Sequence, residues 1–594
     1  MAAKVRSYFV TTPYLTRELK MPPERIILYG DSVGTATPDG IVRLALSFGD
    51  FPPPHYSSRR EFPMSVRLRF APSPTGNVHI GNLRAAIFNW LQARHDNGQF
   101  LLRIEDTDLT RSTPEAIRTL LEVMDWLGLN VDEAPMYQTS QKTRHLEAAN
   151  QLVVNGAAYR HAKGGDASGG EAMLFRLPWN TAGVPGIAVV GPCEIELHAG
   201  TDVVIDQTGI NFAMPSSKGK PMLVQKCLAG FLDLEVLDAA GTVLFRLNDA
   251  IADLLAGTRR ELLQGAAKFR FTRRTITYED LVKGTLTKPL DSLTDFVIVR
   301  SDGSPVFHLG NVVDDITQGI THIVRGDDHV ENTYRHLFLF HALGAVAPRY
   351  AHLPMIVNAQ GKPYSKRDGD AYVGDFRAKG FLPDALFNYL ALLGWSPGDD
   401  REKMTRDELV AAFTLERCKS SAAQMDLRKL ADLNGQYIAA LPPDQFVTMA
   451  WEAVAACPWR AAADPVFFRQ VATLLQSRVK TLDQVAHWGY FFVDTPEYDQ
   501  KACEKTFTDS LVQKALGLVA EELAGLPAAE FTAANLEAAI HGATGACGLG
   551  QGKLNQPLRL AVTGLTIGAG IYETMELLGR ARTLRRLEDV RRHY

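Results

Sequence analysis

The sequence predicts a parallel α/β domain that is interrupted by a β-rich insertion and followed by an all-α region. Shortly after residue 64, short apolar runs alternate with amphipathic helices, which is typical of a doubly wound sheet. Between about residues 163 and 271 the sequence becomes glycine-rich and then carries β-like runs split by turn residues. From Gly380 onward the apolar residues recur with helical spacing, and strand-like runs are few.

Length and composition restrict the class of protein. A chain of 594 residues is too long for one core, and its length suggests roughly three to five domains. No apolar run reaches the about 18 residues that a membrane span needs, so we expect no membrane segment. The net charge of −4 gives no overall attraction to nucleic acid, so RNA contacts must rest on local basic faces.

The cysteines are scattered, and none forms a Cys-x-Cys or Cys-x-x-Cys pair. We therefore expect no zinc site. Scattered thiols without a secretion signal indicate the reducing cytoplasm.

The first 63 residues are rich in proline and tyrosine and show no sustained period. Two alternatives stay open for them: a disordered extension, or upstream sequence that is absent from the mature protein.

The segment from Val66 to Leu91 joins a strand, a turn and a helix. Apolar residues alternate with arginines over 66–70, which predicts a strand. The turn Ala-Pro-Ser-Pro-Thr-Gly at 71–76 ends this strand, because its prolines fix φ and lack a donor. Apolar residues then recur with helical spacing, so a helix begins beside His79. Since a helix N-terminus attracts anions, this is a candidate phosphate site with Ser73 at its mouth.

Further elements follow in the order of a parallel sheet. A strand over 100–104 delivers Glu105, Asp106 and Asp108 at its carboxyl end, where open parallel sheets bind ligands. A helix begins after a Thr cap at Thr113, and another spans roughly 141–155. Later apolar runs at 295–300, 306–315 and 321–328 are predicted strands.

Arg325 lies at the polar end of the last of these runs. On composition alone it is a salt-bridge residue. Beside Arg69 it would instead form a two-arginine cage for a dicarboxylic amino acid, because each guanidinium fork matches two carboxylate oxygens. Both readings stay open on the residue pattern, as does the reading of His79 as a simple helix cap.

Two longer motifs carry a resemblance to a known family. The turn at 71–76 with His-Ile-Gly at 79–81 and Arg-Ile-Glu-Asp-Thr-Asp at 103–108 resembles the first signature of class I aminoacyl-tRNA synthetases, specifically bacterial glutamyl-tRNA synthetases. Gly-Lys-Pro-Tyr-Ser-Lys-Arg-Asp at 361–368 resembles their second signature, the mobile loop that lies over ATP. Pro363 and Tyr364 replace the usual Lys and Leu, so Lys362 is a candidate for the missing first charge.

The resemblance covers about 64–160 and 272–594 and implies a Rossmann-like catalytic domain and an all-α anticodon-binding domain. The insertion is either an inert decoration or a module that contacts tRNA or regulates the enzyme. The implied divisions are an N-terminal extension (1–63), the first half of the catalytic domain (64–162), the inserted region (163–271), the second half of the catalytic domain (272–378), a helical stem-contact domain (379–440) and the anticodon-binding domain (441–594).

The implied activity is that of a glutamate-tRNA ligase. Such an enzyme activates L-glutamate with ATP, which carries Mg²⁺, and transfers it to the 3′ end of tRNA(Glu); the family activates glutamate only with tRNA bound. We expect a monomer. The alternative is a non-catalytic or altered-specificity tRNA-binding paralogue of the same fold. A glutaminyl enzyme would need a β-barrel anticodon domain, whose strands this sequence lacks.

The resemblance also assigns roles to individual residues. His79 and Lys366 are the catalytic candidates. Phe307 stands where the family usually has Tyr, which removes one donor worth about 1–2 kcal/mol. ATP is assigned to Ser73, His79, Gly81, Asn82, Ser365, Lys366 and Arg367; glutamate to Arg69, Ser73, Glu105, Phe307, Asn311 and Arg325; and tRNA to Asp108, Arg111 and Arg478. The arginines of the C-terminal helix, among them Arg586, are either an RNA-binding face or a solvated helix end.

Overall fold

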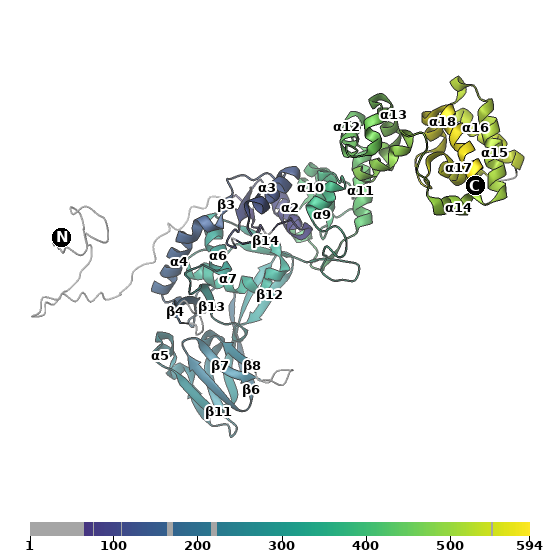
Figure 1. Ribbon diagram of the computed structural model, residues 1–594. Coiled ribbons are helices and arrows are strands. Elements are labelled where there is room, and N and C mark those ends of the chain that lie inside the picture. The colour runs from purple at the N-terminus through teal and green to yellow at the C-terminus, as the bar shows by residue number, and fades with distance from the viewer. Residues whose placement is uncertain (1–64, 75, 109, 163–169, 215–221, 548–550) are drawn as a thin grey trace, which may run out of the picture. The chain divides into compact units, whose positions relative to one another are not determined.

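The computed structural model describes residues 65–74, 76–108, 110–162, 170–214, 222–547 and 551–594 (Figure 1). The predicted N-terminal extension, residues 1–63, lies outside these described residues. Among the helices that the model describes, none is both long and apolar enough to span a membrane.

Parallel strands form the centre of the largest sheet, in the order β3, β2, β1, β14, β15. Strand β1 has β2 on one side and β14 on the other, so the strand order reverses beside it. At such a switch point the loops at the carboxyl ends diverge and open a crevice. The strands span Met136–Tyr137 (β3), Gln99–Ile104 (β2), Arg67–Phe70 (β1), His322–Gly326 (β14) and Arg349–Leu353 (β15).

The helices between these strands include two predicted starts that are confirmed. His79 is the N-cap of α2, and Thr113 caps α3 with Pro114 as the first helical residue. Both caps are local signals, because the capping side chain and the amide it binds lie within three residues. The helices are α2 (Ile80–His95), α3 (Pro114–Trp126), α4 (Lys142–Val154), α6 (Phe307–Thr317) and α7 (Val330–Ala342).

The strand predicted at 306–315 is wrong, because residues Phe307–Thr317 form the helix α6. The run of apolar residues looked continuous enough for a buried strand. Its apolar members Leu309, Val312, Val313 and Ile316 nevertheless follow helical spacing, and the first three are buried while Ile316 is exposed. The run at 295–300 does contain a strand, β13 (Phe296–Val299), but it belongs to a separate antiparallel sheet with β5 (Ala172–Phe175) and β4 (Ala158–His161).

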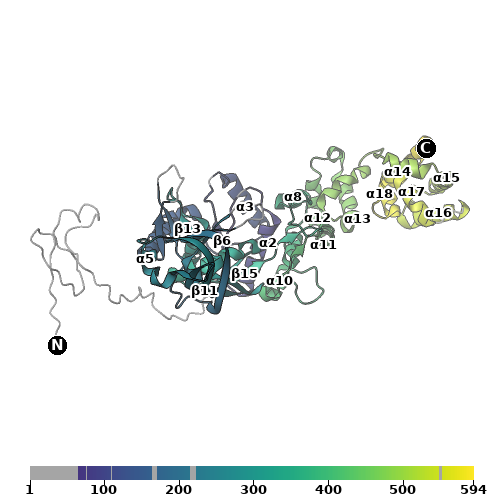
Figure 2. The same ribbon diagram turned by 90° about the horizontal axis from the view of Figure 1, so that it is seen from below.

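The inserted region extends the central sheet. Its long strands β6 (Ile187–Asp206) and β11 (Glu261–Asp280) run side by side and antiparallel (Figures 1 and 2). At its last residue β11 pairs in parallel with Tyr350 of β15, so one strand belongs to both regions. The module has its own core around Phe231 and Phe269. Its other elements are β7 (Gly209–Met214), β8 (Met222–Lys226), β9 (Phe231–Asp238), β10 (Val243–Arg246) and α5 (Ile251–Ala256), and β12 (Gly284–Pro289) pairs with the end of β11.

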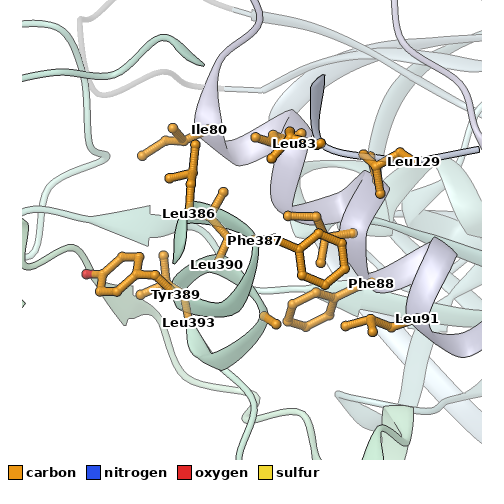
Figure 3. Close-up of a cluster of buried hydrophobic side chains, with 14 of the residues drawn as sticks. Ile80, Leu83, Phe88, Leu91, Leu129, Leu386, Phe387, Tyr389, Leu390 and Leu393 are labelled. Carbon is orange, nitrogen blue, oxygen red and sulfur yellow. The ribbon is translucent and has the colours of Figure 1, made fainter. Parts of the chain in front are cut away.

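Helix α2 is fixed by packing against α9 (Pro383–Leu392), the first long helix after the Ser-Lys-Arg loop. Leu83 and Phe88 of α2 meet Leu386 and Phe387 in a cluster of buried side chains (Figure 3). Each fully buried side chain of this size contributes about 1.5–3 kcal/mol. The helix that begins at the candidate phosphate site is therefore held from two sides, by the sheet and by the helical region.

The all-α character predicted for the C-terminal region is confirmed, with β17 (Ala423–Gln424), paired to β16 (Ile356–Val357), as a two-residue exception. Arg586 is fully buried and donates to backbone carbonyls of Tyr490, Val493 and Val562, so it is a core residue and not part of an RNA-binding face. The helices are α8 (Val373–Ala378), α10 (Arg406–Ala412), α11 (Leu427–Ala439), α12 (Pro443–Ala453), α13 (Pro465–Leu475), α14 (Gln500–Phe507), α15 (Ser510–Gly525), α16 (Ala533–Cys547), α17 (Gln551–Thr563) and α18 (Ile571–His593).

Candidate active site

The two predicted arginines lie on the same face of the sheet. Leu68 of β1 is aligned with His322 of β14, so Arg69 and Arg325 project to one side near the carboxyl ends of adjacent strands. Arg69 is 3% exposed and Arg325 is 8% exposed. Burial lowers the pKa of Arg325, and the positive charge of Arg69 acts in the same direction. These two buried cations therefore make this end of the sheet attractive to an anion.

Arg325 has donor capacity left over. Its Nη1 is buried and has no hydrogen-bond partner. Among the described residues, no carboxylate forms an ion pair with it. A buried guanidinium without a carboxylate is costly unless a ligand supplies one. Of the two arginines, Arg325 is thus the one that lacks an anionic partner among the described residues.

Arg69 is held by a buried ionic network. Its Nε donates to Asp315 Oδ1 at 2.9 Å, and Arg103 Nη1 reaches the same oxygen at 2.5 Å. Arg103 Nη2 also lies 3.3 Å from Glu105 Oε1. Burial acts to raise the pKa of Asp315, but the charges of Arg103 and Arg69 outweigh it and lower that pKa. The aspartate is thus ionised and joins both arginines.

Glu105 lies directly after β2 and is also buried. Burial raises its pKa, with Arg103 and Arg69 acting against the shift. Asn311 Nδ2 donates to Glu105 Oε1 at 3.1 Å, while Asn311 Oδ1 is buried without a partner. The pair therefore keeps free acceptor capacity, on Glu105 and on Asn311, beside the two arginines.

The network includes residues that sequence analysis did not single out as functional. Asp314 accepts from Gln138 at 2.8 Å and lies 2.6 Å from the ring of His145. Arg103 was placed within a strand and at the start of the motif at 103–108, but it was given no role of its own. A charged residue inside the apolar run Phe-Leu-Leu-Arg-Ile was a signal for it, since a buried charge needs a partner. No pattern in the sequence indicated which carboxylate that partner was.

Phe307 and Asn311 lie one helical turn apart on α6, so they share a face. The Phe307 ring stacks on His329 with a centroid distance of 5.5 Å and also contacts His336. Phe307 is half-buried. It lines the same side of the site as Asn311, but it offers an aromatic surface where a tyrosine would offer a donor.

His79 connects the start of α2 to the Ser-Lys-Arg loop. Its Nδ1 accepts from the Gly81 amide at 3.1 Å, which puts its proton on Nε2 when the ring is neutral. Burial lowers the pKa of His79, and a backbone hydrogen bond with Tyr364 acts in the opposite direction. The Ile80 amide donates to Ala371, and the ring of Tyr372 meets the His79 ring edge-on. The first and second signatures are thus in contact.

The loop itself is closed by Asp368. This carboxylate accepts from the Ser365 amide and hydroxyl, both at 2.9 Å, and from Asn358 at 2.7 Å. Hydrogen bonds from Asn358 and Ser365 lower the pKa of Asp368. Lys366 is exposed, and its ammonium lies 5.6 Å from the centroid of the Tyr372 ring. Lys362 and Arg367 are exposed too, so the loop presents its cations to solvent.

The remaining predicted residues lie apart from this cluster of contacts or on its surface. Ser73 and Asn82 are exposed. Arg111 Nε donates to Asp108 Oδ2 at 2.6 Å in an exposed ion pair. Arg478 is exposed in the all-α region, at the end of the short helix η8 (Gln476–Arg478). Among the described residues no group of three His, Cys, Asp or Glu side chains could hold a metal ion.

Comparisons with known proteins match both halves of the chain. A family model for the catalytic domain of class I tRNA synthetases for E and Q matches residues 65–167 and 266–432, which leaves the insertion unmatched. A model for an anticodon binding domain matches residues 445–591. The glutamate-tRNA ligase of Stenotrophomonas maltophilia is 36% identical over 531 residues, covering 88% of this chain and 98% of the relative.

Other relatives agree with these matches. Glutamate-tRNA ligase 1 of Granulibacter bethesdensis is 35% identical over 528 residues, covering 89% of this chain and 97% of the relative. A crystal structure of the glutamate-tRNA synthetase of Elizabethkingia anophelis superimposes with a TM-score of 0.61 at 24% identity, covering 89% of this chain and 100% of that chain. That likeness shows the fold. The identity to the curated relatives shows the family, and it confirms the resemblance seen in the sequence: the chain belongs to the glutamate-tRNA ligases, class I aminoacyl-tRNA synthetases.

Proposed function

We propose that this protein is a glutamate-tRNA ligase, which activates L-glutamate with ATP and transfers it to the 3′ end of tRNA(Glu). The observation that carries the proposal is the pair of buried arginines at the switch point of the sheet, of which Arg325 has an unpartnered Nη1. The family membership supports the same reaction. Relatives named glutamate-tRNA ligase align over nearly their whole length.

The amino-acid end of the site suits a dicarboxylic substrate. Arg69 and Arg325 would bind its carboxylates, because guanidinium forks match carboxylates in geometry and charge. Glu105 would bind the ammonium group, with Asn311 beside it. Phe307 would contact the aliphatic part of the side chain. This division of roles follows the charges: cations for the two acids of the substrate and an acid for its amine.

The ATP end would be formed by His79, the amides at Gly81 and Asn82, and the loop residues Ser365, Lys366 and Arg367. A glutamate carboxylate oxygen attacks the α-phosphorus, the bond to the bridging oxygen breaks, and pyrophosphate leaves. His79 with its proton on Nε2 and Lys366 as a mobile cation stabilise the charge that develops on the phosphates. Mg²⁺ enters as part of the MgATP substrate. Ser73 would lie at the entrance of the site, between the bound ATP and the bound glutamate.

In the second step a hydroxyl of the terminal tRNA ribose attacks the glutamyl carbonyl carbon. That hydroxyl loses its proton, and AMP leaves with the phosphate oxygen. Asp108 and Arg111 would contact the acceptor end, and exposed Arg478 would read the anticodon from the all-α region. We further propose that the chain acts as a monomer in the cytoplasm.

The test is aminoacylation with purified full-length protein, ATP, labelled glutamate and purified tRNA. We expect tRNA(Glu) to be charged and pyrophosphate exchange to require both glutamate and tRNA. Parallel reactions with tRNA(Gln), and with glutamine in place of glutamate, measure specificity. Absence of charging under conditions in which the Stenotrophomonas maltophilia relative charges tRNA(Glu) would overturn the proposal. Retained tRNA binding in that case would favour a non-catalytic paralogue.

A further inference from the structure

A buried chain of hydrogen bonds lies behind Arg325. Its Nε donates to His352 Nε2 at 3.2 Å, and the other ring nitrogen, His352 Nδ1, lies 2.6 Å from Asp280 Oδ2. Both the His352 and the Asp280 side chains are fully buried. Asp280 is the last residue of β11, and His352 lies in β15 beside Arg325 of β14. Three adjacent strands therefore place one carboxylate, one imidazole and one guanidinium in a row.

The hydrogen bonds define the tautomer of His352. An arginine Nε can only donate, so the Nε2 atom facing it must be an acceptor. An ionised carboxylate can only accept, so the proton of the neutral ring lies on Nδ1, toward Asp280. Burial lowers the pKa of His352. Burial acts to raise the pKa of Asp280, but hydrogen bonds from His352, Lys283 and Val282 outweigh it and lower that pKa. A neutral ring beside an ionised aspartate is consistent with this assignment.

The rest of the guanidinium is held in the same way. Arg325 Nη2 donates to the Thr333 hydroxyl at 2.8 Å and to the carbonyl of His329 at 3.2 Å. The Thr333 hydroxyl also lies 3.1 Å from His352 Nε2 and is fully buried. Only Nη1 remains buried and unpartnered. The protein thus satisfies one edge of the guanidinium and leaves the other for a ligand.

We propose that Asp280 and His352 are positioning residues for glutamate recognition, which rests on the function proposed above. Asp280 keeps the His352 proton on Nδ1, so that Nε2 accepts from Arg325 and directs the free Nη1 toward a carboxylate of the substrate. This assigns a role in the site to the end of β11, whose other end lies in the inserted module. Neither residue touches the reacting atoms.

The test is the isosteric substitution Asp280→Asn. The Asp280 Oδ1 accepts from the Val282 and Lys283 amides, at 3.0 and 2.8 Å, so the asparagine oxygen will stay there and its amide will face His352. An amide donor facing Nδ1 moves the ring proton to Nε2. Two donors, the Nε2–H of His352 and the Nε–H of Arg325, would then face each other. We expect KM for glutamate to rise at least tenfold, while KM for ATP and for tRNA changes less than twofold.

The matched control is Asp291→Asn. Asp291 is also a buried carboxylate paired with an arginine, because Arg273 binds it through two contacts of 3.0 Å. We expect this variant to change KM for glutamate less than twofold. A second pair separates positioning from packing: His352→Gln can place an oxygen where Nε2 accepts, whereas His352→Leu cannot. We expect the leucine variant to reproduce the tenfold effect and the glutamine variant to stay within threefold of the parent.

The outcomes distinguish this proposal from the function on which it rests. If the unmodified protein charges no tRNA with glutamate, the proposed function fails. If it charges tRNA but Asp280→Asn leaves KM for glutamate unchanged, or raises all KM values alike, only the positioning role fails. Should Asp280→Asn not fold, as judged by its melting temperature, the histidine pair decides: equal KM values for the leucine and glutamine variants would overturn the proposal.

Discussion

The two ends of the proposed active site, named here the glutamate end and the ATP end after the substrates proposed for them, are built differently. At the glutamate end, Arg69, Arg103 and Asp315 are buried and bound to one another by charged hydrogen bonds. At the ATP end, Lys366 and Arg367 are exposed on a loop that Asp368 closes through local contacts. The first end is part of the protein core, whereas the second is attached to its surface. Substitutions at the glutamate end should therefore affect stability and recognition together, and substitutions in the loop should affect activity alone.

Removing the charge of Asp315 tests the first half of this comparison and has the largest expected effect. Asp315 is 1% exposed and joins two buried arginines. In Asp315→Asn both guanidinium groups lose their main anionic partner, and breaking a buried ion pair on one side costs about 3–5 kcal/mol. We expect the free energy of unfolding, measured by urea denaturation, to fall by that amount.

The control for this prediction is Asp108→Asn, which removes the charge of an exposed carboxylate that accepts from Arg111 and Thr110, while the asparagine oxygen can still accept from Thr110. Exposed ion pairs are screened by water and salt, so we expect no measurable change in the free energy of unfolding. If both variants lose equal stability, the buried network is no more important to the fold than a surface pair. The contrast between core and loop would then be wrong.

Lys366→Ala tests the loop. We expect kcat/KM for glutamate activation to fall roughly 10²–10³-fold, the usual cost of removing one donor to a transition state. The melting temperature should stay the same, because the lysine is exposed and its ammonium group lies against the Tyr372 ring. Pyrophosphate exchange and a thermal melt measure the two quantities on one sample.

Lys362→Ala is the matched control in the same loop, since Lys362 is equally exposed. We expect an effect below tenfold. A larger loss than in Lys366→Ala would mean that Lys362 makes the main phosphate contact. Lys362 would then supply the charge that is missing at Pro363, where the family usually has a lysine. A fall in melting temperature in either variant would contradict the view that the loop contributes little to the fold.

The same contrast explains how much could be predicted from the sequence. The helix start at His79 and the cap at Thr113 depend on neighbouring residues, so local patterns were sufficient. The partner of Arg69 was not predictable in this way, because Asp315 lies 246 residues further along the chain. The error over α6 has the same cause: a run that is buried by several elements looks apolar whether it forms a helix or a strand.

Site residues on loops were therefore easier to nominate than those in the network. The motif residues Ser365, Lys366 and Arg367 are contiguous, so a short stretch of sequence is enough to nominate all three. The network, by contrast, forms only when the fold brings β2 and α6 together, which places Arg103 beside Asp314 and Asp315. The joining of β11 to β15 through Asp280 and Tyr350 is likewise a property of the folded sheet, and no pattern in the insertion indicated it.

A smaller effect is expected from the pH dependence of glutamate binding. Burial raises the pKa of Glu105, so the free protein protonates this group at a higher pH than an ordinary glutamate side chain. The substrate ammonium favours the ionised form, and binding then releases a proton. Since the pKa is raised in the free protein, affinity is present above this pKa and is lost as pH falls through it. We expect KM for glutamate to rise, approaching about tenfold per pH unit below the pKa.

The measurement is KM for glutamate and for ATP between about pH 5 and 8, a range that includes the usual pKa of histidine and lies above that of an ordinary carboxyl group. The ATP value should change little. In Glu105→Gln the dependence should disappear, with KM for glutamate uniformly high. A pH dependence that survives in this variant would belong to a different group, and Glu105 would then not bind the ammonium.

The smallest effect is expected from Phe307→Tyr, which restores the residue usual in the family. Phe307 is half-buried and stacks on His329, so we expect the ring of a tyrosine to keep this position. A donor that finds a substrate oxygen is worth about 0.5–1.5 kcal/mol, so KM for glutamate should fall roughly two- to tenfold. Phe307→Leu, which keeps an apolar side chain but loses the stacking, should raise it. One added donor can lower KM for glutamate only where the groups around it are already fixed in position. An unchanged KM for Phe307→Tyr, with unchanged stability, would therefore mean that the glutamate end is less rigid than its buried arginines suggest.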